Sequence, residues 1–177
     1  SSAASDVYKR QMKKLILAAI LMLVGFQAEA SVPRENRALV IVSELDTHGA
    51  DDLRDLYRAL ENATRTIPLA TLGDDYGRII RLYDNNASVA RFVSTLRALA
   101  ADQNVKAIDV IMSLHGSPGK LHFIEGGVRV NDLKSNLLTD RNPAEHALVA
   151  TLKRKLRLVY NLSCFGATHN SAFVEMG

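Results

Sequence analysis

Four short segments rich in apolar and β-branched residues, separated by segments of helical periodicity, constrain the fold of this chain more than any other feature. The first and third are continuous apolar runs, which is typical of strands buried on both faces. Strands that alternate with helices predict a parallel sheet covered by helices. We therefore expect an α/β protein, a three-layer α/β/α arrangement with a mainly parallel sheet. The four predicted strands are 37–45, 78–83, 107–114 and 156–162.

The segments between these strands carry helix and turn signals. Residues 51–62 have apolar side chains at helical spacing, and 86–101 repeats this pattern after two candidate caps, Asn85 and Asn86. Residues 143–155 begin with a proline, which is favoured in the first helical turn. Two alternating segments within 120–131 flank Gly126-Gly127, a pair that predicts the turn of a β-hairpin.

The two ends of the chain differ from the middle. Residues 1–11 resemble translated adapter sequence from transposase-made sequencing libraries, so we predict a non-native segment there. Residues 12–30 read as a signal peptide, with two lysines, an apolar stretch and the cleavage pattern Ala28-Glu29-Ala30. We expect residues 31–177 to be the mature part, a partial domain that is incomplete at its C-terminus. The signal predicts export to the periplasm or the cell exterior, with no membrane anchor after cleavage.

Charge and cysteine content exclude two classes of protein. Residues 31–177 hold 18 lysines and arginines against 17 aspartates and glutamates, so this part of the chain is nearly neutral. The basicity of the whole sequence therefore gives no reason to expect nucleic-acid binding. A single cysteine, Cys164, cannot form an internal disulfide, so the chain is not a disulfide-stapled scaffold.

Polar residues with catalytic potential follow two of the predicted strands. His115-Gly116 follows the third strand, and Ser163-Cys164 follows the fourth, 49 residues after the histidine. In open α/β sheets, ligands bind beyond the carboxyl ends of the strands. A thiol beside an imidazole is the minimum for nucleophilic catalysis by cysteine. Taken alone, Cys164 reads as a packed core thiol, and its pairing with a histidine at the next strand end favours a nucleophile instead.

The signatures VIMSLHGS and LVYNLSCFG, in this order and each ending an apolar strand, resemble the caspase-like superfamily of cysteine peptidases. The resemblance covers 37–168 and implies a cysteine endopeptidase that hydrolyses polypeptides. It implies that Cys164 is the nucleophile and His115 the acid and base, and that the backbone amides of Gly116 and Cys164 bind the oxyanion. The QAC-x-G pentapeptide of true caspases is absent, and Leu162-Ser-Cys-Phe-Gly166 stands in its place, which favours a legumain-like branch or an uncharacterised bacterial-type branch.

Other histidines and an alternative function were weighed. His48 follows the first strand and is the rival base, but its acidic surroundings indicate a solvated loop. His122 lies in the predicted hairpin as a surface or cross-strand residue. Cys164, His115 and His169 together make only a weak zinc pattern, so we expect no metal, and no phosphate-binding motif predicts a cofactor. The alternative function is a catalytically inactive binding or scaffold module with the same fold.

Overall fold

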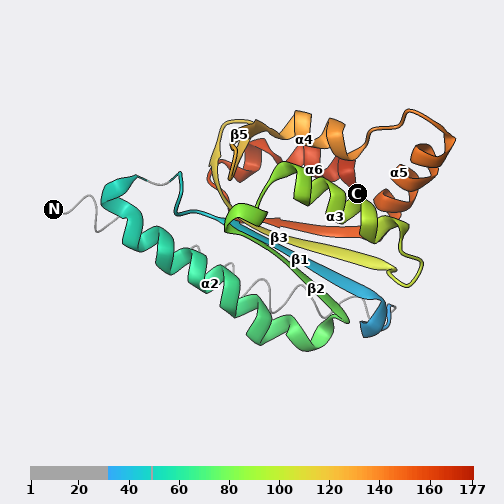
Figure 1. Ribbon diagram of the computed structural model, residues 1–177, viewed down its shortest axis with the longest axis horizontal. Helices are drawn as coiled ribbons and strands as arrows, with labels where there is room; N and C mark the ends of the chain where they lie inside the picture. The colour runs from blue at the N-terminus through green and yellow to red at the C-terminus, as the bar shows by residue number, and fades with distance from the viewer. Residues whose placement is uncertain (1–31, 49) are drawn as a thin grey trace. The chain divides into compact units, whose positions relative to one another are not determined.

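The computed structural model describes residues 32–48 and 50–177 (Figure 1). The predicted adapter and signal peptide lie outside the described residues. Among the helices that are described, none combines the length and the hydropathy that a membrane span requires.

The body from Arg34 to Gly177 is an α/β unit built on a mixed six-stranded sheet. Strand β3 is central: its first part lies between β1 and β6, and its last residues pair with β4. The β2, β1, β3 and β6 pairings are parallel, whereas β4 and β5 form an antiparallel hairpin. The strands are β1 (Arg37–Glu44), β2 (Arg78–Tyr83), β3 (Ala107–Ser117), β4 (Lys120–Phe123), β5 (Gly126–Arg129) and β6 (Leu156–Asn161).

Five helices accompany the sheet in the described residues. Figure 1 shows α2 on one side of the parallel strands and the other four helices on the opposite side. The larger group packs on a single apolar cluster that includes Val40, Val110, Phe92 and Leu96, each at most 1% exposed. The helices are α2 (Arg54–Leu72), α3 (Val89–Ala101), α4 (Val130–Leu137), α5 (Pro143–Lys155) and α6 (Asn170–Met176).

The α/β class and the four parallel strands are confirmed, each predicted strand within three residues of its observed bounds. The hairpin is confirmed too, but its turn is not Gly126-Gly127. Phe123 pairs with Gly126, so the turn residues are Ile124 and Glu125, and Gly126 opens β5 at a φ of 111°. A φ in this region favours glycine, so a glycine is needed at this position although it lies just after the turn.

The helix predicted over 51–62 is too short, because α2 continues to Leu72. Its buried side continues at helical spacing through Glu61, Thr64, Pro68 and Leu72. Two of these residues are polar and one is proline. The hydrophobic periodicity that predicts a helix therefore stops before the helix ends.

Hydrogen bonds explain how polar side chains occupy the buried side of α2. Glu61 Oε1 accepts the Leu45 amide at 3.3 Å. The Thr64 hydroxyl donates to the Leu60 carbonyl at 2.9 Å, and its oxygen lies within hydrogen-bond distance of Ser113 Oγ, at 3.2 Å. A buried polar group that keeps a partner avoids most of the cost of leaving water. The contact between α2 and the sheet therefore includes hydrogen-bonded polar side chains beside apolar ones.

The expected cap of the next helix is also wrong. Ser88, rather than Asn85 or Asn86, caps α3, because its hydroxyl accepts the Arg91 amide at 3.2 Å. The two asparagines lie instead in a 3₁₀ turn over Asp84–Asn86. Asn142 caps α5 in the same way as Ser88, with Pro143 in the first turn as predicted.

A buried charged group joins β3 to β6. Asp109 is 1% exposed and forms an ion pair with Arg157. It also accepts the Tyr76 hydroxyl at 2.8 Å. Burial and this carboxylate raise the pKa of Tyr76, so the hydroxyl remains a donor at any physiological pH.

Replacing Tyr76 by phenylalanine is expected to lower the free energy of unfolding by about 1–3 kcal/mol, because the buried Asp109 loses a donor. Tyr83→Phe is the matched control. In the part of the chain that the structure describes, the Tyr83 hydroxyl is buried without a hydrogen-bond partner, so its removal is expected to be neutral or stabilising. Urea unfolding of both variants measures the difference. Equal losses in the two would contradict the role of the Asp109 contact.

Candidate functional site

The ends of β3 and β6 lie side by side, and a glycine contact fixes their spacing. The two strands are parallel, and Met112 is the partner of Asn161. Beyond that pair the chain of β6 passes directly over Gly116. A Cβ atom on Gly116 would lie 2.1 Å from the Cys164 carbonyl oxygen and 3.0 Å from Ser163 Cβ. Only glycine fits there, so the two predicted motifs meet through their backbones.

His115 is half-buried and held by two neighbours. Its Nε2 lies 2.7 Å from the Leu45 carbonyl oxygen, just beyond β1. The Tyr57 ring of α2 meets the imidazole edge-on, with ring centroids 4.5 Å apart. A carbonyl oxygen only accepts hydrogen bonds, so Nε2 carries the proton and Nδ1 of the neutral ring is the basic nitrogen. This tautomer is assigned from the partners of the ring.

Cys164 lies in the turn that follows β6, and its side chain is exposed. Among the described residues, no hydrogen bond joins its sulfur to His115. Its backbone amide likewise has no hydrogen-bond partner in that part of the chain. The next residue, Phe165, has a φ of 58° and is 56% exposed. A left-handed phenylalanine is strained, and such strain concentrates at functional sites.

Two further imidazoles lie near His115. His122 is its cross-strand partner on β4, which agrees with the predicted cross-strand position. The His48 and His122 ring centroids are 5.9 Å apart, and His48 Nε2 lies 2.9 Å from the Phe123 carbonyl oxygen. Burial, together with His48, His115 and Lys120, lowers the pKa of His122. The exposed turn predicted for His48 is confirmed.

His169 is the residue whose surroundings differ most from the sequence-based expectation. It is 0% exposed and bonded through both ring nitrogens. A ring with both nitrogens engaged offers no lone pair to a metal ion shared with Cys164 and His115. The sequence signal was only its position, five residues after Cys164.

Three carboxylates are close enough to hold a metal ion, with ligand oxygens within 4.8 Å of one another: Glu44, Glu61 and Asp84. Arg65 already bridges two of them, at 2.7 Å from Glu61 and 2.6 Å from Asp84. Burial raises the pKa of Glu61, although the Arg65 guanidinium opposes this effect. The arginine supplies the positive charge that a cation would bring.

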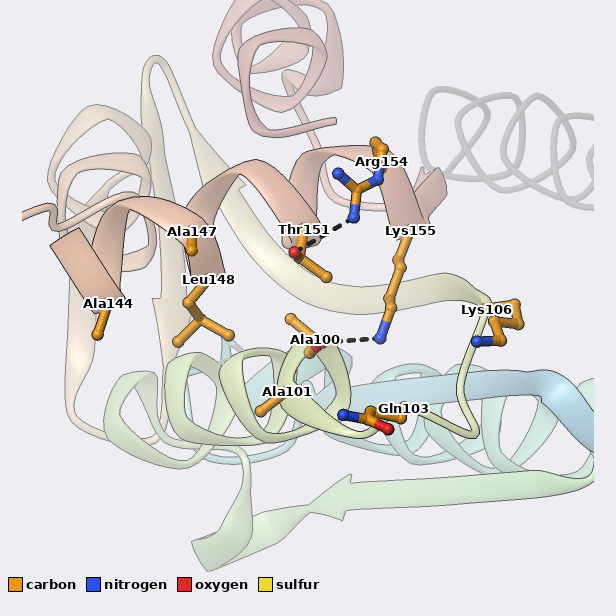
Figure 2. Close-up of a pocket in the computed structure, with 10 residues that line it drawn as sticks. All are labelled: Ala100, Ala101, Gln103, Lys106, Ala144, Ala147, Leu148, Thr151, Arg154 and Lys155. Atoms are coloured by element: carbon orange, nitrogen blue, oxygen red, sulfur yellow. Dashed lines mark hydrogen bonds between the residues drawn. The ribbon is translucent and has the colours of Figure 1, made fainter.

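A groove of about 480 Å³ lies between α3 and α5 (Figure 2). The groove includes the C-terminal ends of both helices, which precede β3 and β6 along the chain, so it lies at the opposite edge of the sheet from Cys164. Figure 2 shows Lys155 reaching Ala100, whose carbonyl oxygen it meets at 2.7 Å. Lys155 also donates to the Asp102 carbonyl at 2.7 Å. The lysine caps the negative end of α3 and forms no catalytic site.

No protein-family model matches this chain, and no curated protein matches it at a significant level.

Replacing Gly116 by alanine is expected to destabilise the protein by about 1–3 kcal/mol or to displace the Cys164 turn, because the added methyl group overlaps a backbone oxygen. Gly73→Ala is the control, since a Cβ there meets nothing within 4 Å. Thermal unfolding and the alkylation rate of Cys164 check both effects. A Gly116→Ala protein with unchanged values in both assays would refute the close contact.

The lowered pKa of His122 predicts a dependence of stability on pH. The unfolded chain binds a proton to this histidine at about pH 6.5, whereas the folded chain does so only at lower pH. Stability is therefore lost as pH falls through about 6.5. In His122→Gln this loss is expected to be smaller, and in His48→Gln intermediate, because one neighbouring imidazole is gone. Urea unfolding between about pH 7.5 and 5 measures it; parallel curves for wild type and His122→Gln would contradict it.

Proposed function

We propose that the chain is a cysteine endopeptidase that hydrolyses peptide bonds through Cys164 and His115. The proposal places these residues on a caspase-like α/β/α domain that is incomplete at its C-terminus. The observation that carries it is the contact of Gly116 with the Cys164 carbonyl, which brings the two strand ends together. The orientation of His115 adds support, since its Nε2 is bonded to Leu45 and Nδ1 is left as the base.

The first half of the reaction forms a thioester. The Cys164 thiol gives its proton to His115 Nδ1, and the thiolate attacks the scissile carbonyl carbon. A carbon–sulfur bond forms while the carbonyl π electrons move to oxygen. The free Cys164 amide, with that of Gly116, donates to this oxyanion. The carbon–nitrogen bond then breaks, and the imidazolium protonates the leaving amine.

The second half restores the enzyme. His115 takes a proton from water, and the hydroxide attacks the thioester carbon. The carbon–sulfur bond breaks, the acid product leaves and the thiolate regains the proton. The Leu45 carbonyl stabilises the imidazolium in both halves, because it accepts from Nε2 in either protonation state.

The setting of this activity rests on the sequence. The predicted signal peptide over 12–30 gives an exported enzyme, acting on polypeptides in the periplasm or outside the cell. No metal or cofactor enters the proposed reaction.

A catalytically inactive binding or scaffold module is the second candidate. It is favoured by the absence of a hydrogen bond between Cys164 and His115 among the described residues. In that case the Gly116 contact serves only to pack the ends of two strands.

Alkylation separates the two candidates, because Cys164 is the only cysteine. For the enzyme, the pH profile of iodoacetamide labelling depends on His115, because the imidazole accepts the thiol proton, so His115→Ala changes this profile. Cys164→Ala and His115→Ala are each expected to abolish cleavage of a peptide library, while His146→Ala, at an exposed position on α5, is the control. Peptide cleavage by Cys164→Ala would refute the proposal, and a profile unaffected by His115→Ala would favour the module.

A further inference from the structure

His169 joins the ends of the two strands that carry the proposed catalytic pair. Its Nε2 lies 3.1 Å from the carbonyl oxygen of Ser117, the last residue of β3. Its Nδ1 lies 3.1 Å from the side-chain nitrogen of Asn161, the last residue of β6. The imidazole thus connects the end of β3, which contains His115, to the end of β6, which Cys164 follows.

The partners of His169 fix the proton on its ring. The Ser117 carbonyl can only accept, so Nε2 carries the hydrogen. Nδ1 then accepts a hydrogen bond from the side-chain nitrogen of Asn161. The side-chain oxygen of Asn161 therefore points to the opposite side, toward Ser163. That oxygen accepts the Ser163 amide at 3.1 Å and the Ser163 hydroxyl at 2.7 Å. Each of these donors therefore has an acceptor. Ser163, the residue before Cys164, is held through its backbone nitrogen and its hydroxyl oxygen.

A second connection runs beside the first. The Thr168 hydroxyl donates to the Phe165 carbonyl at 2.8 Å and accepts the Gly119 amide at 3.1 Å. The segment that follows Cys164 is therefore attached to the end of β3 through His169 and to the β3–β4 turn through Thr168. The Thr168 contact is exposed, whereas His169 is completely buried. A buried hydrogen bond has no water to replace it, so His169 is the stronger attachment.

The geometry points to His169 as a positioning residue that sets the place of Cys164 relative to His115 and the oxyanion amides. This inference rests on the proposed peptidase function. His169 does not touch substrate; it acts through Asn161 and Ser163 on one strand and through Ser117 on the other. A small displacement of a nucleophile is enough to lower a rate constant about 100-fold.

The test compares the kinetics of three variants of the full chain at temperatures where each is folded. His169→Leu removes both hydrogen bonds, whereas His169→Gln keeps a nitrogen donor at the distance of Nε2. Leu152→Ala is the control for lost stability alone, since Leu152 is also 0% exposed but lies on α5, outside the Cys164 turn. The measurements are kcat and KM for peptide cleavage and the pH profile of Cys164 alkylation.

We expect His169→Leu to lower kcat by about 10- to 100-fold with KM nearly unchanged, and to change the pH profile of Cys164 alkylation in the same way as His115→Ala does. His169→Gln is expected to recover most of kcat, and Leu152→Ala to keep the kcat and the pH profile of wild type despite a lower melting temperature. A folded His169→Leu protein with wild-type kcat and profile overturns the inference.

Two further outcomes are decisive. If His169→Leu does not fold, Asn161→Ala removes the donor to Nδ1 at a half-buried position, and the same loss of kcat is expected. Wild-type kcat in Asn161→Ala then overturns the inference. If wild type cleaves no peptide and His115→Ala leaves the alkylation profile unchanged, the proposed peptidase function fails, and the positioning role falls with it. Failure of the inference alone leaves wild-type cleavage and the effect of His115→Ala intact.

Discussion

The pairing of β3 with both β1 and β6 is the constraint on which the rest of the structure depends. The shared part of β3 is almost fully buried, so its backbone groups must be satisfied by its neighbours. Because both pairings are parallel, Leu45, His115 and the Cys164 turn all leave the sheet at one edge. The Leu45 carbonyl then reaches His115 from one side, while the Cys164 turn meets Gly116 from the other. The local order of the site is a product of the sheet register.

The parts of the fold that depend on apolar pattern were predictable from the sequence. Strands β1 and β3 could be located because their buried runs contain few polar residues, and α5 because Pro143 is favoured in a first helical turn. The full length of α2 was not, because Glu61 and Thr64 are buried against partners just beyond β1 and on β3, which lie 16 and 49 residues away in sequence. The prediction of the hairpin turn was wrong for a local reason. Gly126 is the first residue of β5 and has a positive φ, so the glycine is needed beside the turn and not within it.

The candidate site was predictable only as far as side chains mark it. His115 and Cys164 stand out because an imidazole and the only thiol of the chain follow two predicted strands and together allow nucleophilic catalysis. The groups that hold them are mostly backbone atoms, such as the Leu45 and Ser117 carbonyls, and these leave no mark in a sequence. Gly116 was expected as the donor of an oxyanion amide, whereas the structure shows that its missing side chain makes room for the Cys164 turn. His169 gave too little signal, since a single histidine near a cysteine suits many roles.

The contacts around the Cys164 turn fall into two groups, one between residues close in sequence and one between residues about 50 positions apart, and the two groups differ in the entropy lost when they form. Asn161 reaches Ser163 and His169 across two and eight residues, whereas His169 reaches Ser117 across 52 and Thr168 reaches Gly119 across 49. Short loops close at little entropic cost, while distant contacts wait for the sheet to assemble. The turn around the thiol can therefore take shape early, and it meets the imidazole only when β6 docks on β3. A chain in which β6 has not docked on β3 would therefore carry the thiol without its imidazole neighbour.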